Sequence, residues 1–213
     1  MPQLVLPLGH ADRMGRDDFI TAPGNQHAFA YVEAFPDWTA PAMALYGPPA
    51  SGKSHLARIW AERSGASIIA ARDLHLPPDG AVVVEDVDAG LADEGALFAL
   101  LERGGPLLLT GQNPPSTWPA KLPDLHSRFA ALISFGLGAP DEALLMALAV
   151  KLFADRQLQV PEAVVTHLVR QVERAPAALR DFIQRADMRA LEQGRRVNLQ
   201  LVRELMAESA NGI

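Results

Sequence analysis

AMALYGPPASGKS, at residues 42–54, is the stretch of sequence that decides the fold. Its first five residues form an apolar run typical of a buried strand, and residues 47–54 match the P-loop signature G-x-x-x-x-G-K-S. In such a loop, between a strand and a helix, the backbone N–H groups and the N-terminus of the helix point at a phosphate. The stretch therefore predicts a phosphate-binding loop at the end of a strand.

Apolar runs and helical patterns alternate around this loop. Four more short apolar runs predict strands, at residues 67–71, 81–84, 106–110 and 131–135. Apolar residues at helical spacing predict helices at residues 25–35, 54–63 and 94–102. Strands that alternate with helices favour a parallel sheet that is covered on both faces, so the expected fold class is α/β with a five-stranded parallel sheet.

The pattern changes after residue 138, where only helical periods remain. Asp141 and Asn198 stand where helix N-caps belong, and Gly194 stands where a C-cap belongs. The helices expected are at residues 141–156, 162–174, 177–194 and 198–207. We therefore expect a flexible tail at residues 1–10, a nucleotide-binding α/β domain at residues 11–138 and a small all-helical domain at residues 139–213.

Composition excludes several classes of protein. The chain has no cysteine, which removes disulfides and thiolate chemistry, and no apolar run approaches the roughly 20 residues that span a bilayer. Nineteen basic against 25 acidic side chains give a net charge of −6, which disfavours a broad nucleic-acid surface. We therefore expect a cytoplasmic protein without strong direct DNA binding and without a membrane partner.

A second motif supplies the carboxylates that P-loop chemistry needs. Lys53 is expected to neutralise the β- and γ-phosphates, and the Ser54 hydroxyl to ligate Mg²⁺. At the end of the 81–84 run, Glu85 takes the usual metal position and Asp86 the usual position of the base. The alternative interpretation of the two acidic residues is a solvated turn after a strand.

Two further polar residues have two interpretations each. Thr110 ends the fourth run and could reach between the carboxylates and the γ-phosphate, although its β-propensity alone would also place it there. Arg128 precedes the fifth run, where it could act in trans on a phosphoryl group in a neighbour's site. The alternative is a surface arginine that pairs with Asp124.

Taken together, these motifs resemble the AAA+ module of the DnaA family, and within it the Hda group of DnaA-related regulators, including its alphaproteobacterial form. The resemblance covers almost the whole chain and implies a P-loop AAA+ module followed by a helical lid. The strings that carry it are DFI at 18–20 with Asn25, the P-loop with SHL at 54–56, ED at 85–86, LTGQNPP at 109–115, LPDL at 122–125 and SRF at 127–129.

The resemblance implies a set of site residues and the cofactors ADP or ATP with Mg²⁺. The nucleotide-binding residues it implies are Phe19, Ile20, Pro49, Ala50, Ser51, Gly52, Lys53, Ser54 and His55. The catalytic residues it implies are Glu85, Asp86, Thr110 and Arg128, and the metal ligands are Ser54 and Glu85.

The N-terminal segment QLVLPL, at residues 3–8, is similar to the clamp-binding motif of the Hda group. An exposed apolar segment in a tail is costly unless a partner covers it, and Pro7 limits the entropy lost when it docks. The alternative is that the tail packs on its own domain. The clamp-binding residues implied are Gln3, Leu4, Leu6, Pro7 and Leu8.

By resemblance, the function is negative regulation of replication initiation. The chain would bind the DNA polymerase III β sliding clamp, contact DnaA, and promote hydrolysis of the ATP that DnaA holds, which is the regulatory inactivation of DnaA. DnaA carries a helix-turn-helix domain after its lid, and no such domain follows the lid in these 213 residues. The implied partners are DnaA and the clamp, and homo-oligomerisation stays open.

Two departures from the family pattern affect the expected activity. Glu85 replaces the usual aspartate at the metal position, and Ala177 stands where the family places a lid arginine, with Arg174 and Arg180 nearby. We therefore expect weak or no intrinsic ATP hydrolysis. The alternative is a self-sufficient AAA+ ATPase such as a helicase loader.

Overall fold

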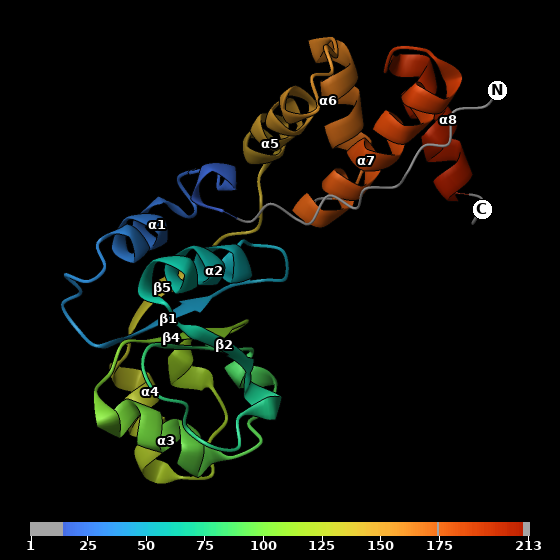
Figure 1. The fold of residues 1–213 in the computed structure, drawn as a ribbon. Helices are drawn as coiled ribbons and strands as arrows, with labels where there is room; N and C mark the ends of the chain where they lie inside the picture. Colours follow the sequence, from blue (N-terminus) through green and yellow to red (C-terminus); the bar gives the residue numbers. More distant parts are fainter. Residues whose placement is uncertain (1–14, 174, 211–213) are drawn as a thin grey trace. The chain divides into compact units, whose positions relative to one another are not determined.

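The computed structural model describes residues 15–173 and 175–210, and the chain divides into two compact units at residues 139 and 140 (Figure 1). The predicted clamp-binding residues lie outside the described residues: Gln3, Leu4, Leu6, Pro7 and Leu8. Arg174 lies outside them as well.

A five-stranded parallel sheet forms the centre of the first unit, in the order β2-β3-β4-β1-β5. It confirms the predicted α/β fold class. β1, which runs into the P-loop, lies between β4 and β5, and its three middle residues are buried because helices cover both faces. The strands are β1 Ala42–Tyr46, β2 Ser67–Ala70, β3 Val82–Glu85, β4 Leu107–Gly111 and β5 Ile133–Gly136.

Two helices cover each face of this sheet (Figure 1). Alternate side chains of β1 point to opposite faces, so Met43 and Leu45 pack with α1 and α2 while Ala44 packs with α3 and α4. The helices are α1 Gln26–Glu33, α2 Lys53–Ser64, α3 Glu94–Arg103 and α4 Pro123–Ala131. Short 3-10 turns lie at η1 Arg16–Asp18, η2 Ala71–Asp73, η3 Val87–Ala89 and η4 Pro115–Thr117.

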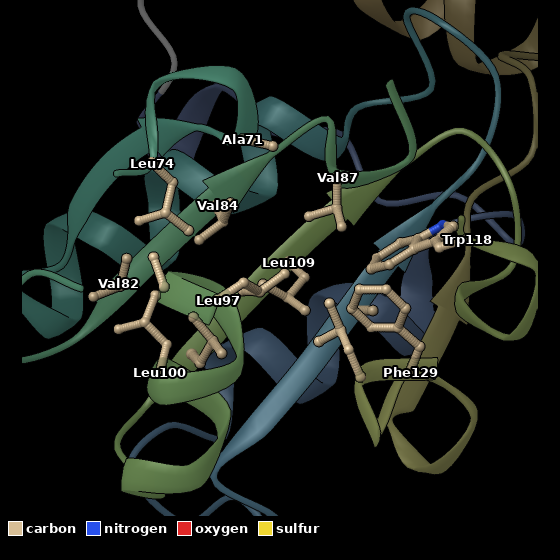
Figure 2. Close-up of a cluster of buried hydrophobic side chains, with 14 residues drawn as sticks. Ala71, Leu74, Val82, Val84, Val87, Leu97, Leu100, Leu109, Trp118 and Phe129 are labelled. Carbon is tan, nitrogen blue, oxygen red and sulfur yellow. The ribbon is translucent and has the colours of Figure 1, made fainter. Parts of the chain in front are cut away.

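The sequence patterns do not predict α4. Its buried residues are Leu125 and Phe129, a single pair one turn apart, which is too short a series to show a helical period. Tertiary packing stabilises the helix instead, because the Phe129 ring meets Trp118 edge-on at 5.1 Å inside the cluster that α3 and α4 form with the sheet (Figure 2).

The second unit contains four helices among its described residues, in agreement with the predicted all-helical region. Asp141 caps the first of them through its side chain, which accepts a hydrogen bond from Leu144 N at 2.7 Å. The helices are α5 Glu142–Asp155, α6 Glu162–Gln171, α7 Pro176–Gln193 and α8 Leu199–Ala210.

The parallel register brings the ends of three strands to one edge of the sheet. Tyr46, the last residue of β1, pairs with Gly111 at the end of β4. β3 pairs with β4 on its other side and ends at Glu85. The P-loop and the ends of β3 and β4 therefore share the carboxyl edge, which is where ligands bind in open α/β sheets.

Candidate nucleotide site

Two glycines give the loop between β1 and α2 its close fit. Gly47 has φ +150°, and a Cβ added there would lie 2.2 Å from the carbonyl oxygen of Leu137. Gly52, the N-cap of α2, has φ +101°, and an added Cβ would meet the Phe19 ring at 3.5 Å. Side chains at these two positions would strain the backbone and fill the space around the loop, so the loop requires glycine at both.

The loop also holds a buried hydroxyl. Ser51 is 7% exposed, and its Oγ has no hydrogen-bond partner among the described residues. Ala50, just before it, has φ +60°, which is uncommon for a residue with a side chain. A strained backbone and an unpaired buried polar atom are both costly, and such costs concentrate where proteins bind ligands.

Lys53 lies buried in the first turn of α2 and folds back over the loop. Its Nζ donates hydrogen bonds to Gly47 O at 2.8 Å and to Pro48 O at 2.9 Å. Burial lowers the pKa of the Lys53 ammonium, and three nearby carboxylates oppose that shift. The two hydrogen bonds place the Lys53 Nζ within the loop, where a bound anion would contact it. The opposing carboxylates, largest effect first, are Asp86, Asp88 and Glu85.

The predicted carboxylates and Thr110 come together at the ends of β3 and β4. Asp86 follows β3 with φ +58°, in the left-handed region. Its backbone N–H donates to Thr110 Oγ1 at 3.1 Å, and Thr110 is buried. β-propensity alone does not account for Thr110, because its hydroxyl accepts a hydrogen bond from the backbone of Asp86.

Sequence reasoning missed Asp88. Its Oδ2 accepts hydrogen bonds from Gln112 N at 2.8 Å, Asn113 N at 2.9 Å and Asn113 Nδ2 at 3.1 Å. A third acidic residue close after Glu85 and Asp86 was the signal available in the sequence. It becomes informative only when the turn after the neighbouring strand is known to lie beside it.

Aromatic side chains flank the loop near the implied nucleotide-binding residues Phe19 and Ile20. The ring of Phe19 stacks on Phe29 at 5.2 Å and 7°, and it meets the ring of His55 edge-on at 5.2 Å. His55 Nε2 donates to Gly15 O at 3.0 Å, which ties α2 to the start of the described chain. Phe19 and His55 therefore lie together beside the P-loop.

The buried Asn25 fixes the turn that follows Phe19. Its Nδ2 donates to Ile20 O at 3.0 Å, and its Oδ1 accepts from Ala22 N at 2.8 Å. The remaining loop positions of the predicted set, Pro49 and Ala50, are exposed, and so is Ser54 in the first turn of α2. A phosphate ligand could reach these residues from solvent.

Arg128 lies apart from this group. It stands in the last turn of α4 and forms an ion pair with Glu102, in the last turn of α3, with the two side chains 52% and 45% exposed. Asp124, the partner expected for a surface arginine, is not the residue that it contacts. Because α3 and α4 run back from the carboxyl edge to the starts of β4 and β5, their last turns lie toward the amino edge of the sheet.

In the second unit, Ala177, the residue that the resemblance places at the lid-arginine position, is in the first turn of α7. Ala177 is exposed there, and Arg180 follows about one turn later with a half-buried side chain. Ala177 has no charge or hydrogen-bonding group that could replace the arginine.

No protein-family model and no curated protein sequence matches the chain. Its fold is nevertheless similar to solved structures. Domain III of the replication initiation protein DnaA from Thermotoga maritima aligns with a TM-score of 0.75 at 18% identity, over 93% of this chain and 97% of that chain. AMPPCP-bound DnaA from Aquifex aeolicus aligns with a TM-score of 0.73 at 16% identity, over 85% and 67%.

The RuvB Holliday junction branch migration motor of Thermotoga maritima aligns with a TM-score of 0.71 at 17% identity, over 91% of this chain and 71% of that chain. At these identities the likeness shows the fold alone, which is similar to that of DnaA domain III and of RuvB. Within residues 15–173 and 175–210, no helix combines the length and hydropathy that crossing a membrane requires.

Proposed function

We propose that the chain is a negative regulator of replication initiation that holds a nucleotide in its own P-loop and promotes hydrolysis of ATP bound to DnaA. The observation that carries the proposal is the position of Arg128, which is about half exposed and lies toward the amino edge of the sheet. The P-loop lies at the opposite edge. β1 alone, with five residues at ~3.3 Å each, separates the two edges by about 15 Å.

That separation argues against a role for Arg128 in the chain's own site. An arginine stabilises a transferring phosphoryl group by direct contact, so it must reach the site that it serves. A half-exposed guanidinium can reach a second molecule after giving up one exposed ion pair, which costs about 1 kcal/mol or less. We therefore assign Arg128 to a partner's ATP.

The residues around the P-loop fit a bound ADP or ATP. Gly47 and Gly52 permit the positive φ angles of the loop, Lys53 supplies a buried cation, and the Ser51 hydroxyl lacks a partner among the described residues. The hydroxyl of Ser54 and the carboxylate of Glu85 are hard oxygen ligands suited to Mg²⁺. Bound magnesium would neutralise phosphate charge. Phe19, Ile20 and His55 would face the base side of the nucleotide.

DnaA and the β sliding clamp are the partners proposed. An AAA+ fold shared with DnaA makes a contact between two such modules a reasonable arrangement, and the segment at residues 3–8 is the proposed clamp-binding element. With Ala177 at the lid position, we propose that the bound nucleotide mainly sets the shape of this chain and is hydrolysed slowly.

A DnaA-bound ATP hydrolysis assay tests this function. Release of phosphate from ATP-loaded DnaA is measured with and without this chain, and with and without clamp loaded on DNA. We expect hydrolysis to accelerate only when the chain and the loaded clamp are both present, and to return to the basal rate with Leu6→Ala and Leu8→Ala combined. Hydrolysis that stays at the basal rate in every mixture would reject the proposal.

A self-sufficient AAA+ ATPase is the second candidate. It is favoured by the two carboxylates near Lys53, those of Glu85 and Asp86, and by the hydrogen bond from the backbone of Asp86 to Thr110. It predicts steady turnover by the isolated chain that Lys53→Ala abolishes. Tight ADP binding with negligible turnover would instead favour the regulator.

A further inference from the structure

Asp88 connects two strands at the carboxyl edge of the sheet. It lies in η3, directly after β3, and one of its carboxylate oxygens, Oδ2, accepts three hydrogen bonds from Gln112 and Asn113, directly after β4. Two of the donors are successive backbone N–H groups. Hydrogen bonds to an ionised carboxylate are stronger than neutral ones, so the contact fixes the turn after β4 against the turn after β3.

A second hydrogen bond crosses the same gap in the opposite sense. Asp86 N, after β3, donates to Thr110 Oγ1 in β4. The two strand ends are therefore joined reciprocally, since the backbone after β3 bonds to a side chain of β4 and the backbone after β4 bonds to a side chain after β3. Asp86 keeps φ +58° in this arrangement, a conformation that surrounding contacts must stabilise.

The turn after β4 is also fixed to the P-loop and to the core. Gly47 N donates to Gly111 O at 3.2 Å. A Cβ on Gly111 would lie 2.7 Å from the Trp118 ring, and Trp118 Nε1 donates to Asn113 O at 2.7 Å. These contacts fix the turn against the P-loop and against Trp118, and so place Thr110 relative to the P-loop. The hydrogen bonds to Asp88 fix the same turn against the residues after β3.

We propose that Asp88 is a positioning residue for the magnesium–nucleotide site. It fixes the turn at residues 111–113, so that Thr110 holds the backbone of Asp86 and the carboxylates of Glu85 and Asp86 stay near Lys53. The expected effect on magnesium and nucleotide binding rests on the proposed function. The hydrogen bonds that link the ends of β3 and β4 do not depend on any ligand.

Asp93 provides a contrast that separates positioning from general stabilisation. Its Oδ1 also accepts backbone hydrogen bonds, from Gly95 N at 2.8 Å and Ala96 N at 3.2 Å, but both donors belong to the helix that it caps. Asp93→Ala therefore removes a comparable number of hydrogen bonds without disconnecting β3 from β4. It is the matched control for Asp88→Ala.

The first measurement is amide hydrogen exchange of the nucleotide-free protein by NMR, read at Asp86. Asp88 does not bond to this amide, so the readout reports an effect transmitted through Thr110. We expect Asp88→Ala to accelerate exchange at Asp86 about tenfold, Asp88→Asn to have a smaller effect because it keeps a neutral acceptor, and Asp93→Ala to change it less than twofold. Unchanged exchange at Asp86 in Asp88→Ala would overturn the inference.

The second measurement is the ratio of the ADP dissociation constants without and with Mg²⁺. Because only the carboxylates are misdirected, we expect Asp88→Ala to reduce this ratio at least fivefold and to leave the metal-free Kd within about twofold. Asp93→Ala should leave the ratio unchanged. A ratio equal in wild type and Asp88→Ala, with ADP bound tightly, would also overturn the inference.

The two measurements distinguish this inference from the proposed function. Wild-type protein that binds no ADP would reject the proposed function, and exchange at Asp86 would still decide the role of Asp88. If Asp88→Ala fails to fold, Asp88→Asn decides both measurements.

Discussion

At the carboxyl edge of the sheet, the side chains of Lys53, Thr110 and Asp88 are bonded to backbone groups of neighbouring segments, and the first two are buried. At the amino edge, Arg128 and Glu102 bond to each other through long, half-exposed side chains. Backbone partners fix an orientation, whereas an exposed side-chain pair exchanges easily with solvent or another molecule. This difference matches the proposed function, in which the first edge holds a ligand of the chain itself and Arg128 at the second edge acts on a partner.

Replacing Lys53 should have the largest effect. Lys53→Ala removes the buried cation from the loop, so we expect ADP affinity to fall about 100-fold or more, which is roughly 2.7 kcal/mol. Titration calorimetry checks this, with Lys121→Ala as the control because Lys121 has an exposed side chain. Equal affinity in wild type and Lys53→Ala would mean that the loop is not the ligand site.

Gly47→Ala should be the next largest change, and it acts on the fold as well as on binding. The added Cβ would lie 2.2 Å from Leu137 O, so we expect a loss of about 2–4 kcal/mol in the free energy of unfolding, measured by urea denaturation. Gly65→Ala is the matched control, since Gly65 also has positive φ, +70°, but nothing within 4 Å of an added Cβ. Its cost should be only about 1–2 kcal/mol. Equal losses would show that the close fit to Leu137 contributes nothing.

The burial of Lys53 predicts a pH dependence. Its pKa is lowered from the ordinary 10.5, so the folded state binds fewer protons than the unfolded state between the folded pKa and 10.5. The free energy of unfolding of wild type should therefore rise with pH in that interval relative to Lys53→Met. Urea denaturation at several pH values from neutral up to the ordinary lysine pKa of 10.5 measures the difference. A difference that stays constant across this range would contradict the assigned cause.

Glu102→Gln should have the smallest effect on stability. Because its ion pair with Arg128 is about half exposed, we expect a change within about 1 kcal/mol in the free energy of unfolding. Urea denaturation at low and moderate salt checks both the size and its screening. A loss above about 2 kcal/mol would mean that Arg128 is structurally fixed and not available to a partner.

The elements of the α/β fold were predictable because their signals are local. Residues 42–54 carry a complete strand, loop and helix start, and an unbroken apolar run such as residues 82–84 indicates a strand covered on both faces. The same local patterns identified Glu85, Asp86 and Thr110 as candidates. α4 was not predictable in this way, since its stability comes from the contact of Phe129 with Trp118 in the core.

The contacts of the candidate residues were not predictable, because they join residues far apart in the sequence. Asp88 bonds to groups 24 and 25 positions later, and Arg128 pairs with Glu102, 26 positions earlier, in place of Asp124 on its own helix. Such pairs depend on strand order and on the packing of α3 beside α4. The sequence therefore predicted the candidate residues of the site but not the hydrogen bonds and ion pairs that they form.

The measurement that tests the central claim most directly compares Arg128→Ala with wild type in two readouts. In the hydrolysis assay with ATP-loaded DnaA and DNA-loaded clamp, Arg128→Ala should lower the stimulated rate at least tenfold. Its own ADP affinity should stay within about twofold of wild type, because Arg128 lies at the edge opposite the P-loop. An unchanged rate of DnaA-bound ATP hydrolysis, or a loss of the chain's own ADP affinity, would contradict the assignment of Arg128 to a partner's ATP.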